Sequence, residues 1–203
     1  MKIKSFGGID FQLLGIGRTG HVGFNEPGSH LNSGTRKIIL DHITRIDASP
    51  AFLGLENVPR SAITMGISTV KSAKRIVLLA WGGDKAEILR ETIEGEISAQ
   101  VPASYLQMHG NTTFILDQGA AAELTRVKTP WLVTSCLWNE SLKLKAVVWL
   151  SELMNKSILK LTDKDYNNNG MSGLLTQEGT AYDLNIKMFN KIQHTITGWP
   201  GGK

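Results

Sequence analysis

The sequence predicts an α/β fold, in which a mostly parallel sheet is covered by helices and is followed by a C-terminal helical extension. Short apolar runs alternate with helix-like segments through about residue 126, and the runs are nearly continuous, as in strands buried on both faces. The clearest strand pattern, KRIVLLAW at 74–81, directly precedes the clearest helix pattern, DKAEILRETIEG at 84–95. After KTPW at 128–131, helical patterns replace the strand-like runs. We therefore divide the chain into 1–127 and 128–203.

The elements of the first part follow from apolar runs and helical spacing. Runs of mostly apolar residues between turn signals predict strands at 10–16, 36–40, 61–67, 74–81 and 112–117. Helical spacing predicts helices at 42–54, 68–73, 84–95 and 118–125. Pro50 interrupts the first of these helices, and Gly95 ends the third.

The second part has the composition of helices followed by a linker. We expect a long helix at 135–158, a polar loop at 162–173 and a second helix at 180–196. The apolar stripe of that second helix is predicted to comprise Ile186, Phe189, Ile192 and Ile196. Four of the five tryptophans lie in this part, which predicts that it packs against a surface, and the TGWPGGK end is typical of a linker.

Composition narrows the class of protein. The single cysteine, Cys136, excludes an internal disulfide framework, fits a cytoplasmic location and, within the apolar run WLVTSCLW, is expected to be a packing residue. No apolar stretch is long enough to cross a membrane, and the start shows no secretion signal. The net charge of +4 comes from scattered residues without interleaved aromatics, which disfavours nucleic-acid binding. No metal-ligand spacing is present, so we expect neither a metal nor a cofactor.

The run GIGRTGHVGFNEPGS at 15–29 begins with the spacing of a dinucleotide-binding loop. Such a loop must open a helix whose N-terminus holds the pyrophosphate. Here a Pro- and Gly-rich stretch follows without helical period, although Asp41 stands about where a ribose-binding acid would be expected. The pattern therefore favours a ligand-binding loop at the carboxyl edge of the sheet over a cofactor loop.

His21 and Glu26 give that loop a possible chemistry. An imidazole titrates near neutrality, and Glu26 could orient the ring and raise its pKa, a pairing that suits proton transfer on a polar substrate. The alternative is that His21 only hydrogen-bonds a turn. A second candidate site is WGGDK at 81–85, between the strongest strand and helix, where free N–H groups and Lys85 favour a phosphate. There too a plain capped turn, with Asp84 as N-cap, is the alternative.

These motifs together resemble the glucosamine-6-phosphate deaminase/isomerase family, with its sugar-phosphate isomerase and 6-phosphogluconolactonase relatives. The resemblance rests on the Gly-His-x-x-Phe-Asn-Glu-Pro run, on SAITMGISTVKSAKRIVLLAWGGDKAEIL and on TTFILD, and it covers roughly residues 9–125. It implies a Rossmann-like α/β/α fold and the conversion of an amino-hexose 6-phosphate to a keto-hexose phosphate with release of ammonia.

The resemblance also implies roles for individual residues. His21 would assist opening of the sugar ring and Glu26 would support His21. Substrate-binding positions would be Gly17, Gly20, Asn25, Arg45 and Lys85, with Lys85 holding the phosphate.

Three departures from the family pattern stand out. Thr19 replaces an Asp that the family's loop usually carries, and it completes the set of catalytic positions. Pro50 stands where relatives commonly supply a phosphate-binding Arg, which leaves Arg45 as a substitute. Relatives also carry a whole N-terminal half before this region. We therefore expect the C-terminal part of a deaminase-like domain at 1–127, inactive alone and self-associating, with a further domain possible beyond residue 203.

Two other functions stay open at this point. A non-catalytic sugar-phosphate binding or regulatory module is favoured by Thr19 and by the lack of an N-terminal half. A lactonase-type enzyme is the nearest catalytic alternative within the same family. In each case the expected partner is a small phosphorylated sugar, and a homo-oligomer is expected.

Overall fold

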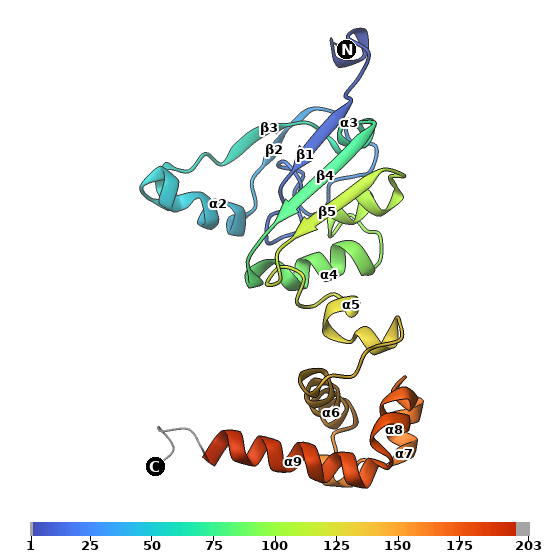
Figure 1. The fold of residues 1–203 in the computed structure, drawn as a ribbon. Coiled ribbons are helices and arrows are strands. Elements are labelled where there is room, and N and C mark those ends of the chain that lie inside the picture. The colour runs from blue at the N-terminus through green and yellow to red at the C-terminus, as the bar shows by residue number, and fades with distance from the viewer. Residues whose placement is uncertain (1, 198–203) are drawn as a thin grey trace. The chain divides into compact units, whose positions relative to one another are not determined.

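The computed structural model describes residues 2–197, and the chain divides into two compact units, Met1–Val127 and Lys128–Lys203. All the strands belong to unit 1 (Met1–Val127), whereas the described residues of unit 2 (Lys128–Lys203) form only helices and loops (Figure 1). The predicted linker residues 198–203 lie outside the described residues.

Strands and helices alternate along unit 1. In chain order they are α1 Lys2–Ser5, β1 Phe11–Leu14, β2 Arg36–Ile39, α2 His42–Ala48, β3 Ser61–Thr64, α3 Ile67–Lys71, β4 Arg75–Ala80, α4 Ala86–Glu94, β5 Thr112–Leu116 and α5 Thr125–Lys128. A 3-10 helix, η4 Pro102–Met108, lies between α4 and β5.

The main sheet is parallel, with β4 between β1 and β5. The predicted α/β class with a parallel sheet and covering helices is confirmed. One part of the prediction is wrong, because β2 and β3 pair antiparallel in a separate two-stranded sheet. Burial alternates along β2, which is the pattern of a half-exposed antiparallel strand and not of a buried parallel one.

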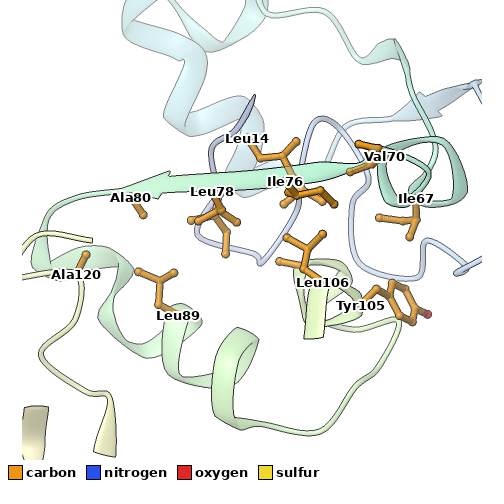
Figure 2. Packing of buried hydrophobic residues seen from close by; sticks show 14 residues of the cluster. Leu14, Ile67, Val70, Ile76, Leu78, Ala80, Leu89, Tyr105, Leu106 and Ala120 are labelled. Atoms are coloured by element: carbon orange, nitrogen blue, oxygen red, sulfur yellow. The ribbon is translucent and has the colours of Figure 1, made fainter. Parts of the chain in front are cut away.

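The core of unit 1 lies on one face of the parallel sheet. Figure 2 shows Ile76 and Leu78 of β4 pointing toward Leu89 of α4 and Leu106 of η4, and all four side chains are fully buried or nearly so. On the opposite face, Phe11, Leu13 and Ile115 are each more than half exposed. Val77 on this second face is buried, so the face is only partly covered by the described residues, and the burial on both faces that the apolar runs predicted is found only in part.

The predicted helix at 118–125 is wrong. The Asp117 carboxylate accepts the N–H of Ala120 at 2.7 Å, and the chain then forms consecutive turns until α5 begins at Thr125. Asp favours such local turns because its side chain competes with the helical hydrogen-bond pattern.

Unit 2 contains α6 Glu140–Met154, α7 Asp163–Asn168, α8 Ser172–Glu178 and α9 Ala181–Thr197. The polar loop predicted at 162–173 is wrong, because Thr162 and Asp165 form a capping box that starts α7. The apolar stripe predicted for α9 is also shifted. Ile186 and Ile196 are exposed, while Leu184 and Met188 are fully buried.

Candidate functional site

Two loops leave the same edge of the parallel sheet. The loop 15–35 follows β1, and the loop 81–85 follows β4. Because β1 and β4 are hydrogen-bonded parallel neighbours, their carboxyl ends lie side by side, which is where α/β sheets bind ligands. The first loop opens no helix, whereas a dinucleotide-binding loop would open one.

A tight turn places the His21 ring against Gly17. The Gly17 N–H donates to the His21 carbonyl at 3.0 Å, and the Gly20 N–H donates to the Gly17 carbonyl at 3.0 Å. A Cβ atom on Gly17 would lie 1.7 Å from His21 Nε2, so only glycine leaves room for the ring in this position. Gly20 has a φ of +77°, and a Cβ there would lie 2.8 Å from Val101.

The hydrogen bonds of the ring decide which nitrogen is available. His21 Nδ1 lies 2.6 Å from the Gly23 carbonyl oxygen, which can only accept, so Nδ1 carries the proton in the neutral ring. Nε2 is then the unprotonated nitrogen and can accept a proton from a ligand. The Phe24 ring stacks nearly parallel to the imidazole, with ring centroids 6.4 Å apart.

Glu26 is buried but is not paired with His21. Its carboxylate accepts from the Thr19 hydroxyl at 3.4 Å and from the Asp41 N–H at 3.3 Å. The Gly23 carbonyl, and not Glu26, therefore orients the His21 ring in this structure. The Asp41 side chain caps α2 by accepting the Ile43 N–H, so it is engaged in the helix start and does not serve a ribose.

Asn25 is fully buried and anchors the loop to the antiparallel strands. Its amide group donates to the carbonyls of Val22 and Met65 at 2.9 and 2.7 Å. Its oxygen accepts from Arg36 at 2.9 Å. Asn25 therefore has a structural role in holding the loop. Its substrate-binding role remains what the family resemblance implies.

The second loop is held by Asp117. The Gly82 N–H donates to both Asp117 carboxylate oxygens, at 3.1 and 3.2 Å, and Gly82 has a φ of +89°. A Cβ on Gly119 would lie 3.1 Å from the Gly83 nitrogen, so the two turns pack backbone to backbone. Lys85 leaves this turn partly buried, with its ammonium 3.4 Å from the Asp84 carboxylate.

Charges from both loops converge on Asp47 of α2. Arg18, inside the Gly-rich run, forms an ion pair with Asp47. Hydrogen bonding to Arg18 lowers the pKa of the Asp47 carboxyl, burial opposes this, and the charges of Arg18, Lys85 and His21 lower it further. The same ion pair raises the pKa of Arg18. The structure therefore brings the His21 and Lys85 loops around one carboxylate.

Arg45, the expected substitute for a phosphate-binding Arg, is engaged elsewhere. Its guanidinium donates to the carbonyls of Leu55 and Val58 at 2.9 and 3.4 Å. Its Nε is buried without a hydrogen-bond partner among residues 2–197. It thus holds the segment that follows α2.

The sequence reasoning missed Arg18 and Asp47, and also the role of Asp117. Only Asp117 had a signal, since it is the acidic residue that ends the strand run TTFILD. Within the described part of the chain, no cluster of His, Cys and carboxylates could hold a metal ion. None of the helices described is long and apolar enough to span a membrane.

Known proteins resemble this chain mainly over unit 1. The sequence model of the family described as glucosamine-6-phosphate isomerases/6-phosphogluconolactonase matches residues 2–115. The glucosamine-6-phosphate deaminase of Bifidobacterium longum (strain DJO10A) is 54% identical over 123 residues, which are 60% of this chain and 46% of that protein. A glucosamine-6-phosphate deaminase-like protein of Bacteroides thetaiotaomicron is 58% identical over 202 residues, 100% of this chain and 30% of its own length.

A solved structure supports the same relationship. A monomeric glucosamine-6-phosphate deaminase aligns with a TM-score of 0.59 at 46% identity, covering 60% of this chain and 51% of that one. The chain thus spans about half the length, or less, of the relatives that it matches. The family match covers more than half of the chain, including both site loops. This chain therefore belongs to the family of glucosamine-6-phosphate isomerases and 6-phosphogluconolactonases.

Proposed function

We propose that this chain supplies the ring-opening and phosphate-binding part of a glucosamine-6-phosphate deaminase site. The reaction converts an amino-hexose 6-phosphate to the keto-hexose phosphate with release of ammonia. The proposal rests on two groups that loops from neighbouring strands carry. One is the unprotonated Nε2 of His21, and the other is the ammonium of Lys85. The deaminases among the relatives support the choice of reaction.

The hydrogen bond of His21 Nδ1 leaves Nε2 as the nitrogen that can exchange a proton with the sugar. Opening a cyclic sugar requires removal of a proton from the anomeric hydroxyl and delivery of a proton to the ring oxygen. With Nδ1 donating to Gly23, Nε2 accepts the first proton, and the resulting imidazolium returns it to the ring oxygen.

Lys85 provides the charge for the phosphate end of the substrate. Its ammonium is partly buried, lies 3.4 Å from the Asp84 carboxylate, and is near enough to Asp47 to lower the pKa of that carboxyl. A phosphate dianion is a stronger partner for an ammonium than one exposed carboxylate is. In the proposed complex the Lys85 ammonium donates to the phosphate oxygens, and the Asp84 side chain turns to solvent.

The transfer of a proton between carbons 1 and 2 needs a further carboxylate. Glu26 is engaged with Thr19 and Asp41. We therefore propose that this base comes from a segment equivalent to the part of the relatives that this chain does not match. The exposed apolar side chains Phe11, Leu13 and Ile115 support the same arrangement. We expect the 203 residues alone to be inactive and to self-associate, and the complete protein to act in the cytoplasm.

The alternative is a sugar-phosphate binding module without catalysis, which the exchange of the family's Asp for Thr19 favours. Thr19 cannot hold a negative charge, and its hydroxyl is used to donate to Glu26. A lactonase reaction is the other alternative that family membership leaves open.

A coupled ammonia assay on the complete protein separates these functions. His21→Gln should lower turnover of glucosamine 6-phosphate about 10²–10⁴-fold, while His30→Gln in the same loop should not change it. If neither the wild type nor the control variant releases ammonia but both still bind glucosamine 6-phosphate, the protein is the binding module instead. Hydrolysis of a sugar lactone by the wild type without ammonia release would establish the lactonase.

Lys85→Ala tests the phosphate site independently of turnover. By calorimetry the affinity for glucosamine 6-phosphate should fall about 10–100-fold, and the affinity for unphosphorylated glucosamine should not change. Equal losses for both sugars would refute the role of Lys85.

A further inference from the structure

Unit 2 contains a cleft outside the site described above. It has a volume of about 470 Å³, and its lining consists of Trp131, Thr134, Ser135, Cys136, Trp138, Gly170, Gly173 and Gln177. None of these side chains is charged, and all lie beyond residues 2–115 that the family model matches. The cleft therefore has its own chemistry, separate from the phosphate site in unit 1.

Trp131, one of the residues that line the cleft, carries a hydrogen-bond donor without a partner among the described residues. Trp131 is only 5% exposed, and its indole N–H meets no acceptor among the described residues. The ring itself is fixed, because Trp138 lies against it with centroids 5.9 Å apart and Trp149 meets it edge-on at 5.4 Å. Buried indole N–H groups usually find a partner, so this one is suited to an acceptor on a bound molecule.

The rest of the lining combines one further aromatic ring with neutral polar groups. Trp138 is partly buried and adds an indole ring, while Thr134 and Ser135 add hydroxyl groups. The amide nitrogen of Gln177 donates weakly to the Trp138 carbonyl at 3.5 Å, so its oxygen remains as an acceptor. Such a wall fits a molecule that has an apolar face and a polar edge and carries no charge.

Two glycines keep this wall open. Gly170 has a φ of +78°, and a Cβ there would lie 3.2 Å from the Trp131 carbonyl oxygen. A Cβ on Gly173, in contrast, would meet Trp138 Nε1 at an ordinary 3.6 Å. The cleft can thus be narrowed at Gly173 without a backbone clash.

We propose that this cleft binds a neutral carbohydrate ring. The C–H face of the sugar packs on the indole of Trp138, and a ring or hydroxyl oxygen accepts the N–H of Trp131. The hydroxyls of Thr134 and Ser135 and the oxygen of Gln177 pair with the sugar hydroxyls. Since no cation lines the cleft, it selects unphosphorylated sugars, whereas the site in unit 1 is proposed to take a phosphorylated one.

Cys136 gives a direct readout, because it lines the cleft and is the only cysteine of the chain. The rate of its alkylation by iodoacetamide is measured on the full chain, with glucose or N-acetylglucosamine as the probe. With a Kd on the order of 10 mM, a sugar at about 50 mM should slow alkylation about six-fold. Glucosamine 6-phosphate at the same concentration should protect less, and inorganic phosphate should not protect.

Variants separate binding at the cleft from unspecific effects. Trp131→Phe retains an aromatic ring without the N–H and should abolish protection, as should Gly173→Leu, which fills the cleft. Trp149→Phe changes an indole of the same cluster that does not line the cleft, and it should retain protection. Circular dichroism verifies that each variant is folded.

Absence of protection by either sugar in the wild type would overturn the proposal. So would protection that persists in folded Gly173→Leu or in folded Trp131→Phe.

Discussion

The two units hold their charged side chains in opposite ways. In unit 1 the Arg18–Asp47 pair is about two-fifths exposed, with side-chain accessibilities of 43% and 38%, and it lies at the loops of the proposed site. In unit 2, Lys143 and Glu178 are only 6% and 11% exposed and pair with each other. Glu140 and Lys187 extend this second network. The exposed charges remain available to a ligand, whereas the buried ones join helices.

The buried network connects three helices of unit 2. Lys143 belongs to α6, Glu178 ends α8 and Lys187 belongs to α9. Removal of one partner leaves the other buried and uncompensated, which costs far more than the loss of an exposed pair. The difference between the units therefore predicts where substitutions change activity and where they change stability.

The largest effect is expected for Gly17→Val. It tests whether a substitution at the site loop of unit 1 lowers activity without unfolding the unit. The new side chain must displace the His21 ring, so turnover by the complete protein should fall about 10²–10⁴-fold. The backbone at Gly17 needs no positive φ, so thermal stability should change little. Gly15→Val is the matched control, because nothing lies within 4 Å of a Cβ there. Equal turnover in the two variants would contradict the role given to His21.

A smaller effect is expected for Lys143→Met, which tests the buried network. The loss should be about 2–4 kcal/mol of unfolding free energy, below the top of the range for buried pairs because Lys187 still contacts Glu178. Hydrogen exchange should accelerate in α6 and not in β4. Arg18→Met removes the exposed pair of unit 1 and should leave exchange in both units unchanged. Equal acceleration of hydrogen exchange by both variants would contradict the distinction between the exposed pair of unit 1 and the buried network of unit 2.

The smallest effect is expected on the stability of unit 2 when the pH is lowered. Hydrogen bonds from Lys187 and Lys143 lower the pKa of Glu140 from 4.5 to about 2, and the pKa of Glu178 is lowered as well. Since the folded-state pKa values lie below the unfolded ones, this stabilisation is complete above pH 4.5 and is lost as the pH falls toward 2. Thermal melts of unit 2, followed by tryptophan fluorescence, should show a falling midpoint in this window. Glu140→Gln should reduce the slope, and an unchanged slope would contradict the assignment.

The sequence was sufficient where a local pattern determines the structure. The apolar run at 74–81 became β4, and the pattern at 84–95 became α4, which ends before Gly95 as expected. The Gly- and Pro-rich run also indicated correctly that no helix opens directly after β1. These features depend on residues that are adjacent or one helical turn apart.

The remaining features depend on contacts between residues distant in the sequence. Local pattern cannot show that β2 pairs with β3, or that Arg18 reaches Asp47, 29 positions later. It also suggested that Glu26 would orient His21, whereas the structure joins Glu26 to the Asp41 N–H, 15 positions away. The capping box of Thr162 and Asp165 is different, because its spacing was present in the sequence and was not recognised.

The parallel pairing of β1 and β4 has a consequence for substrate choice in the proposed reaction. Neighbouring strands are about 4.8 Å apart, and His21 and Lys85 each follow one of them through turns fixed by Gly17 and by Asp117. In the proposed reaction, the sheet thus sets a fixed span between the group that acts on the anomeric carbon and the group that holds the phosphate. Sugars shorter or longer by one carbon should reach only one of its two ends, so chain length would be selected by backbone hydrogen bonds and not by a side-chain pocket.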